Sequence, residues 1–242
     1  TMKKILLAEN TPDGLIASLY LQERFQTCDP LFGESPARFE TLGLPIYSAG
    51  IPAKRAEMYI DNKGEYEETD GKIIKPDWTL AEIAKSYFPC PRYDHLENNT
   101  LFGCFFDLYG ASSCFGQLRF DPWSWNDENV TRYMNWQKKT AEMLLASKDD
   151  GEAEVFLLPP EAGSLCRKLL FLGTNAKLVL MLQGRRFWLQ ARHGYERAFN
   201  LRNFLFDQAD GGIFTGQLNP IKLQERLIDA IEKYDEKGEM FR

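Results

Sequence analysis

The sequence lacks the short motifs by which catalytic sites are usually recognised. It contains no G-x-S-x-G, no G-x-x-x-x-G-K-[ST] and no G-x-G-x-x-G, and only two of its 242 residues are histidines, His95 and His193. A serine hydrolase elbow, a P-loop and a Rossmann-type dinucleotide loop are therefore not indicated. No apolar run approaches the roughly 20 residues that span a bilayer, so we expect no membrane segment.

Cysteine is also sparse, and its pattern argues against a disulfide framework. The five cysteines are odd in number and form no C-x-x-C pair, which is typical of reduced thiols in the cytoplasm. The segment Cys90–His95 places a thiol, an acid and an imidazole close together, but zinc sites usually need a second pair of ligands. We favour a solvated loop over a metal site or a Cys–His nucleophile, and predict no cofactor and no bound metal.

Charge is present but unevenly distributed. The net charge is −6, and the acidic excess lies in residues 1–121, where 12 Lys and Arg stand against 18 Asp and Glu. This balance argues against generic nucleic-acid binding and favours either a basic partner or simply high solubility.

The order of helix and strand signals predicts an α+β fold, with a mixed or antiparallel sheet, hairpins and several helices packed against it. We expect one domain over residues 1–242, with a weak subdivision near 148–151. Thr11–Gly14 is interpreted as a turn. The predicted helices are Leu15–Phe25, Thr79–Phe88, Asp127–Ser147, Ser164–Leu172, Tyr195–Phe206 and Asn219–Tyr234. The predicted strands are Lys3–Ala8, Ala56–Ile60, Glu65–Thr69, Lys72–Lys75, Leu101–Tyr109, Phe115–Phe120, Ala153–Leu158, Lys177–Leu182 and Arg186–Ala191.

Aromatic residues are the most concentrated feature of the chain. Eight of the 24 residues in Phe102–Trp125 are Phe, Tyr or Trp. Because both alternating faces of Leu101–Tyr109 are apolar, we predict a central strand buried on both sides. Two acids in the block, Asp107 and Asp121, could serve as general acids, but solvent exposure and a turn before Pro122 are favoured.

The segment Leu6–Gly14, LLAENTPDG, resembles the first strand and acidic pocket of response-regulator receivers. In that family a later strand ends in a phospho-acceptor Asp and a further strand ends in Lys. Neither follows here at suitable spacing, so we do not assign the chain to that family.

A second cluster interleaves basic and aromatic residues, Arg185-Arg186-Phe187-Trp188 and then Arg192. This composition is found in grooves that bind single-stranded nucleic acid. Since the chain is acidic overall, we favour a hairpin whose arginines pair internally with the acidic first half.

With so few catalytic signals, the sequence favours a non-catalytic cytoplasmic binding protein of bacterial origin. The specific hypothesis is an inhibitor or immunity-type protein that neutralises a basic partner such as a toxin, by charge complementarity and aromatic anchors. Its proposed partner-binding residues are Glu65, Glu67, Glu68, Asp70, Trp123 and Trp125. The alternative is an enzyme with a dispersed site, acting on a phosphorylated or nucleotide substrate held by Arg185, Arg186 and Arg192.

Overall fold

The computed structural model describes residues 4–53, 55–60, 72–74, 100–148, 151, 153–192, 208–210 and 213–217. Backbone contacts gather into two compact units, Thr1–Asn135 and Trp136–Arg242. Both units combine helices with a sheet, which confirms the predicted α+β class. The prediction of one domain with a weak subdivision near 148–151 stays a prediction. None of the described helices is both long and apolar enough to cross a membrane.

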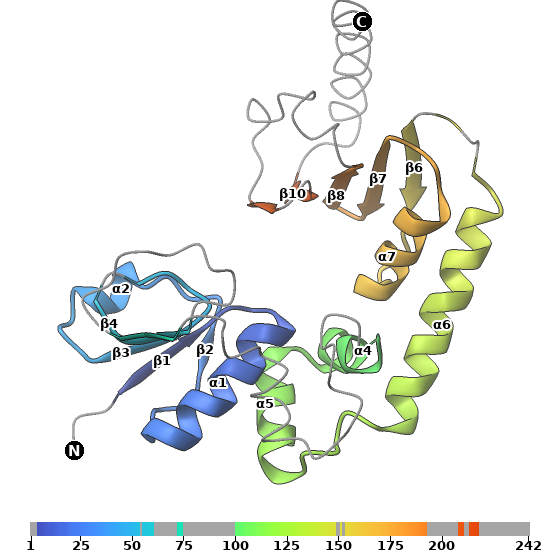
Figure 1. Cartoon of the computed structure of the whole chain (residues 1–242). Coiled ribbons are helices and arrows are strands. Elements are labelled where there is room, and N and C mark those ends of the chain that lie inside the picture. Colours follow the sequence, from blue (N-terminus) through green and yellow to red (C-terminus); the bar gives the residue numbers. More distant parts are fainter. Residues whose placement is uncertain are drawn as a thin grey trace, which may run out of the picture. The chain divides into compact units, whose positions relative to one another are not determined.

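The N-terminal unit is built on a five-stranded sheet of order β2-β1-β3-β4-β5 (Figure 1). All four strand pairs in it are parallel. Its strands are β1 (Ile5–Ala8), β2 (Leu31–Phe32), β3 (Ile46–Ala49), β4 (Ala56–Ile60) and β5 (Lys72–Ile74). Its helices are α1 (Pro12–Phe25), α2 (Ala37–Glu40), α4 (Thr100–Tyr109) and α5 (Ala111–Phe120).

Helix α1 is the central helix of this unit because it contacts the sheet as well as α4 and α5. Every residue from Gly14 to Leu21 is buried, so the helix is enclosed on more than one face. Its first turn carries Pro12, whose fixed φ suits the first helical position. Its last turn ends at Gln26, which adopts the left-handed conformation with φ 52° and donates its N–H to the Gln22 carbonyl. The predicted turn Thr11–Gly14 is thus the start of the helix.

The aromatic block forms helices, so the prediction of central strands over Phe102–Phe120 is wrong. Helices α4 and α5 meet at Gly110, which has φ +75°. On α4 the ring centroids of Phe102 and Phe105 lie 6.0 Å apart, and those of Phe105 and Tyr109 lie 5.5 Å apart. These rings recur every three or four residues and therefore share one helical face. The block contributes to the core, but with helical rather than strand periodicity.

The C-terminal unit contains a mixed sheet of order β6-β7-β8-β10-β9. Strands β6 and β7 are parallel, whereas β7 and β8 form the predicted antiparallel hairpin, with a turn at Gly184 (φ +60°). The strands are β6 (Ala153–Leu157), β7 (Leu178–Gln183), β8 (Arg186–Ala191), β9 (Gln208–Asp210) and β10 (Ile213–Gln217), and the helices are α6 (Glu128–Leu145), which begins in the N-terminal unit, and α7 (Ser164–Gly173).

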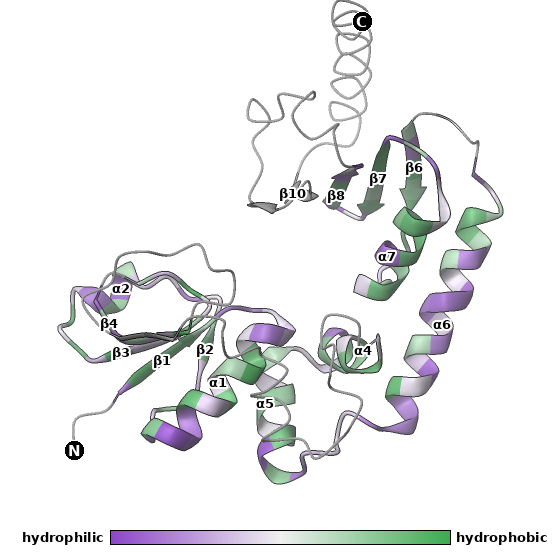
Figure 2. Cartoon of the chain, viewed as in Figure 1, coloured by the Kyte–Doolittle hydropathy of each residue, from purple (hydrophilic) through white to green (hydrophobic). Residues whose placement is uncertain are grey.

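Apolar side chains of α6, α7 and the sheet make up the core of the C-terminal unit. In Figure 2 the hydrophobic colour covers much of β6, β7 and α7, while α6 alternates between hydrophobic and hydrophilic turns. The buried cluster consists of Ala141, Phe156, Leu158, Ala162, Cys166, Leu170, Ala176, Val179 and Met181.

Several sequence predictions lie outside the described residues. These are the strand Glu65–Thr69, which would have paired with β4 in a hairpin, and the helices Thr79–Phe88, Tyr195–Phe206 and Asn219–Tyr234. Strand β4 pairs in parallel with β3 on one side and β5 on the other. The remaining predicted elements outside the aromatic block occur in the structure with ends shifted by at most three residues.

Helix α7 is capped by a side chain from α6. The Oε1 atom of the fully buried Gln137 accepts the Gly163 N–H at 2.9 Å and the Cys166 N–H at 3.1 Å. The N-cap residue, Gly163, supplies no side-chain cap of its own. Two of the backbone donors that every helix N-terminus leaves unpaired are therefore satisfied by Gln137.

We predict that Gln137→Met lowers the free energy of unfolding by about 2 kcal/mol, because it leaves two buried N–H groups without an acceptor. Urea denaturation measures this change. The matched control is Lys138→Met on the exposed side of α6, which should change stability by less than about 0.5 kcal/mol. Equal losses in the two variants would contradict the capping role.

The start of α6 is fixed by Asp127. Its Oδ1 accepts the Asn129 N–H at 2.9 Å, and its Oδ2 accepts the Tyr109 hydroxyl at 3.1 Å. The Asn129 N–H is the main reason that the pKa of Asp127 lies below its usual value, and the Tyr109 hydroxyl acts in the same direction. The folded state thus favours the ionised carboxylate.

Because the pKa of Asp127 is lower in the folded than in the unfolded state, the ionised carboxylate stabilises the protein. This stabilisation is complete above the unfolded pKa, about 4, and is lost as the pH falls through the folded pKa. We predict that Asp127→Asn, which keeps a good cap, loses less stability than the wild type between pH 5 and strongly acidic solution. Urea midpoints across this range test it. The control is Glu142→Gln, an exposed carboxylate of the same helix, which should follow the wild-type curve.

Candidate functional site

The parallel sheet of the N-terminal unit has a topological switch point beside β1. The chain leaves β1 through α1 to β2 on one side, and β3 then pairs with the other side of β1. In open parallel sheets, ligands bind outside the carboxyl ends of the strands where the strand order reverses in this way. The candidate site is therefore the edge where β1, β2 and β3 end, which we call the carboxyl edge.

Backbone hydrogen bonds hold the residues of the carboxyl edge together beyond the strands themselves. The Glu9 N–H donates to the Ala49 carbonyl at 2.9 Å, and the Gly33 N–H donates to the Ala8 carbonyl at 2.8 Å. On the next strand, the Gly50 N–H donates to the Ile60 carbonyl at 2.9 Å. The ends of four neighbouring strands are thus fixed at one level, with Glu9 near the middle.

Thr11 links the end of β1 to the start of α1. Its hydroxyl donates to Oε2 of Glu9 at 3.3 Å and accepts the Gly14 N–H at 3.1 Å. One side chain therefore caps the helix and orients a half-buried carboxylate. Asp13 lies in the first turn of α1, so a second carboxylate belongs to the same junction.

Gly14 allows helix and strand to approach closely. A Cβ atom on this residue would lie 2.1 Å from the Glu9 carbonyl oxygen, much closer than two nonbonded atoms can approach. Only glycine therefore permits the observed path from β1 into α1. The position of the Glu9 carboxylate depends on this contact, because the Glu9 backbone packs directly against the first turn of the helix.

The carboxyl edge combines carboxylates with the positive end of the α1 dipole, which favours phosphate and other anions. Pro12 has no N–H, and the N–H groups of Gly14 and Leu15 already donate to Thr11. Glu9 can accept a proton from a nucleophilic water molecule, and its oxygen atoms, with those of Asp13, are of the type that Mg²⁺ and Mn²⁺ prefer. The described residues contain no group of three His, Cys, Asp or Glu that could hold a metal ion. The described residues alone therefore do not complete a metal site.

The predicted acidic partner surface cannot be placed, because Glu65, Glu67, Glu68 and Asp70 lie outside the described residues. The same holds for the segment Cys90–His95.

The two tryptophans proposed as anchors are placed differently from each other. Their rings stack with centroids 6.1 Å apart and an interplanar angle of 23°. Trp125 is 4% exposed and Trp123 is 43% exposed, so only Trp123 presents a substantial surface to solvent. Asp121 ends α5 and its Oδ1 accepts the Trp123 N–H at 2.9 Å, as expected for a turn residue. Asp107 lies on α4, partly exposed.

The three arginines of the cluster also differ from one another in their surroundings. The Arg192 guanidinium donates to the carbonyls of Ala176, Phe171 and Thr174 and lies 5.1 Å from the centroid of the Phe171 ring. It therefore pairs internally, and its partners among the described residues are backbone carbonyls of its own unit. Arg185 and Arg186 are exposed at the turn between β7 and β8.

Two buried thiols are poor candidates for nucleophiles. Burial raises the pKa of Cys114 to about 12 and that of Cys166 to about 11. The reactive form of cysteine is the thiolate, which such values suppress at neutral pH. Both residues serve as small apolar groups in the two cores.

Sequence reasoning missed the carboxyl edge, although a signal was present. Thr11, Pro12 and Gly14 were interpreted as a turn, but Thr followed by Pro is also the pattern of a helix N-cap and first helical position. Directly after an apolar strand, that pattern indicates a strand-to-helix junction of an α/β unit. The acids on either side, Glu9 and Asp13, then become site candidates.

Comparison with known proteins gives matches to solved structures only. No protein-family model matches the chain, and no curated protein matches its sequence. The chain is similar to the pGpG-specific phosphodiesterase PggH of Vibrio cholerae, with a TM-score of 0.58 and 10% identity, over 96% of this chain and 99% of PggH. It is also similar to RecJ of Thermus thermophilus in complex with Mn²⁺, with a TM-score of 0.53 and 10% identity.

The RecJ match covers 97% of this chain but only 52% of the Thermus protein, so the chain spans about half of that RecJ. An exonuclease RecJ bound to manganese has a TM-score of 0.53 and 11% identity, over 96% of this chain and 89% of that one. At these identities the similarity establishes a shared fold.

These neighbours overturn the prediction of a non-catalytic inhibitor or immunity-type protein. That prediction rested on the lack of catalytic motifs and on the acidic first half of the chain. The fold instead matches, along almost the whole chain, proteins described as an exonuclease and a phosphodiesterase. The assignment of Glu65, Glu67, Glu68, Asp70, Trp123 and Trp125 to a partner surface stays a prediction.

We predict that Gly14→Ala destabilises the N-terminal unit by about 3 kcal/mol or more, because the new methyl group would overlap the Glu9 carbonyl. Chemical denaturation measures the loss. The control is Gly103→Ala, where a Cβ meets nothing within 4 Å inside α4. That variant should be neutral or up to about 1 kcal/mol more stable. Similar stability of the two variants would contradict the close approach.

Proposed function

We propose that this protein is a phosphoester hydrolase that acts on a phosphorylated or nucleotide substrate at the carboxyl edge. The observation that carries the proposal is the junction of β1 with α1 at the topological switch point, where Thr11 orients the Glu9 carboxylate. The similarity in fold to a pGpG-specific phosphodiesterase and to RecJ exonuclease supports this class of reaction.

Phosphoester hydrolysis needs a base for the attacking water and a positive potential for the phosphoryl oxygens, and the carboxyl edge supplies both. In the reaction, a water oxygen forms a bond to phosphorus while the bond from phosphorus to the leaving oxygen breaks. The positive end of the α1 dipole stabilises the phosphoryl oxygens. The Glu9 carboxylate, held by the Thr11 hydroxyl, accepts the proton of the attacking water, and the leaving oxygen takes its proton from a solvent water molecule.

In the alternative drawn from the sequence, Arg185, Arg186 and Arg192 hold the substrate together, and the structure leaves Arg192 out of that set. Arg192 already donates to three backbone carbonyls, so its guanidinium is occupied within the protein. Arg185 and Arg186 are exposed and remain the members of the cluster that could contact a phosphate.

We predict that the full chain hydrolyses a phosphodiester and that Glu9→Gln lowers kcat/KM by about 10²- to 10⁴-fold, because the proton acceptor is lost. The substrates are bis(p-nitrophenyl) phosphate, the dinucleotide pGpG and a short single-stranded DNA. Each is assayed with EDTA and with added Mn²⁺, so that a metal requirement appears as a difference between the two conditions.

The control is Glu128→Gln, which removes an exposed carboxylate of the same unit outside the carboxyl edge and should retain full activity. Unfolding curves of both variants separate a catalytic effect from a structural one. An absence of turnover for all three substrates in both conditions, or wild-type turnover by a folded Glu9→Gln variant, would refute the proposal.

A further inference from the structure

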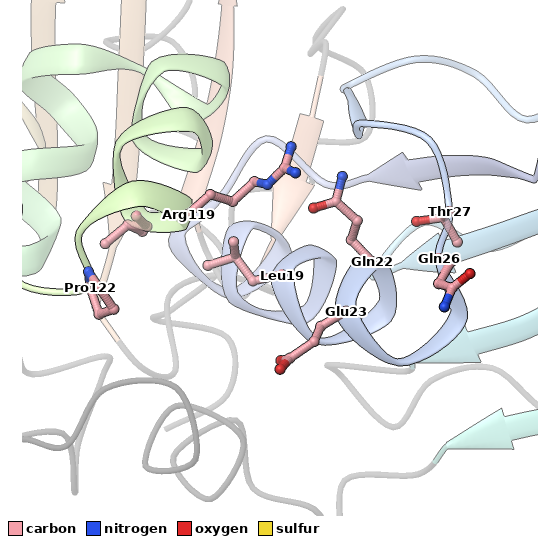
Figure 3. A pocket seen from close by; sticks show the side chains of 8 residues that line it. Leu19, Gln22, Glu23, Gln26, Thr27, Arg119 and Pro122 are labelled. Atoms are coloured by element: carbon pink, nitrogen blue, oxygen red, sulfur yellow. The ribbon is translucent and has the colours of Figure 1, made fainter.

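The N-terminal unit has a cavity of about 480 Å³ between the second half of α1 and the end of α5 (Figure 3). Two of its polar lining groups, Gln22 and Arg119, already donate to Oδ1 of Asp29, at 2.7 and 3.0 Å. Its leucines, Leu19 and Leu118, are almost fully buried. The cavity therefore leaves few groups to a ligand, and the outer edge of the mixed sheet in the C-terminal unit is the more specific surface.

Strand β6 lies at that edge, with β7 as its neighbour in the described sheet (Figure 1). Directly after the strand, the Leu158 N–H donates to the Leu182 carbonyl of β7 at 2.7 Å. Backbone groups of successive residues point to opposite sides of a strand, so every second residue before Leu158 also faces β7. The N–H and C=O groups of Ala153, Val155 and Leu157 therefore point away from the sheet, and no described strand lies beyond them.

The side chains of these three residues form an exposed apolar face. Val155 is 51% exposed and Leu157 is 71% exposed, while Glu154 and Phe156 between them are buried on the other face. Soluble proteins usually protect an edge strand with charged side chains, with proline or with a covering element. Ala153, Val155 and Leu157 are neither charged nor proline, so β6 is open to pairing with another strand.

A second copy of the chain fits this edge by symmetry. In an antiparallel pair centred on Val155, that residue lies opposite its own copy, and Ala153 lies opposite Leu157 of the other copy. Each outward N–H of one strand then meets an outward C=O of the other, because directly opposite residues exchange both hydrogen bonds at these positions. Apolar side chains also lie opposite apolar side chains along the whole exposed face.

The neighbouring registers are disfavoured. A shift by two residues in one direction places Glu154 directly opposite Glu154 of the copy, and like charges across a strand pair are destabilising. A shift by two residues in the other direction brings Pro159 opposite Ala153, and proline has no N–H to donate. The register centred on Val155 avoids both conflicts.

We propose that this protein forms a symmetric homodimer through β6, in which antiparallel pairing joins the two mixed sheets into one continuous sheet. The dimer covers Val155 and Leu157 of each copy with the same residues of the other. It involves no residue of the carboxyl edge and is therefore independent of the hydrolase proposal. Because one short strand from each copy makes a small interface, we expect the dimer to dissociate on dilution.

Analytical ultracentrifugation of the full chain, from nanomolar to submillimolar concentrations, tests the proposal. We expect a monomer–dimer equilibrium that depends on concentration. Val155→Lys and Val155→Glu should each weaken dimerisation by about tenfold or more, because each places like charges opposite one another at the symmetry axis. An equimolar mixture of the two variants should regain dimerisation close to that of the wild type, because the facing charges are then opposite in sign.

The control is Leu172→Lys, which adds the same charge at another exposed leucine of the unit and should leave dimerisation unchanged. Since Val155 is half exposed, both of its charged variants should fold, and circular dichroism checks this. A wild-type chain that stays monomeric at every concentration would overturn the proposal and point to a strand of another protein as the occupant. Dimerisation of Val155→Lys at wild-type strength, or a mixture of the charged variants that stays monomeric, would overturn it as well.

Discussion

The contact on which the N-terminal unit depends is the approach of Gly14 to the Glu9 carbonyl. Without a side chain at Gly14, helix α1 can begin within a few residues of the end of β1. That short connection sets the direction of α1, whose buried face then packs against the sheet and against α4 and α5. The same connection places Thr11 where its hydroxyl serves both the helix and a carboxylate. Fold and candidate chemistry therefore share one local constraint.

Much of the secondary structure could be predicted from the sequence, because the residue pattern of each element agrees with the burial of its side chains in the fold. The strand at Ile5–Ala8 and the hairpin around Gly184 are examples in which apolar pattern and turn residues point to the same structure. The aromatic block is different, because a short run that is apolar on all sides fits periods of 2 and 3.6 equally well. Packing decided in favour of helices, with Gly110 as the break between them.

The candidate site could be predicted only in part, for a physical reason. The residues of the site are close in sequence, but whether they form a site depends on which strands flank β1. Strand order is set by long-range pairing that no local pattern encodes, and the parallel neighbours of β1 are supplied by Leu31–Phe32 and Ile46–Ala49.

The continuity of helix α6 affects how the two units unfold. Near its start, Asp127 is bonded to Tyr109 of the N-terminal unit, and ten residues later Gln137 holds the start of α7 in the C-terminal unit. A continuous helix cannot melt in the middle without losing turns on both sides, because helix formation is cooperative. Partial unfolding of one core therefore destabilises the adjoining turns of α6, and through them the turns that pack against the other core. The two units should consequently share part of their unfolding transition, and slow hydrogen exchange in α6 would mark where that shared transition resides.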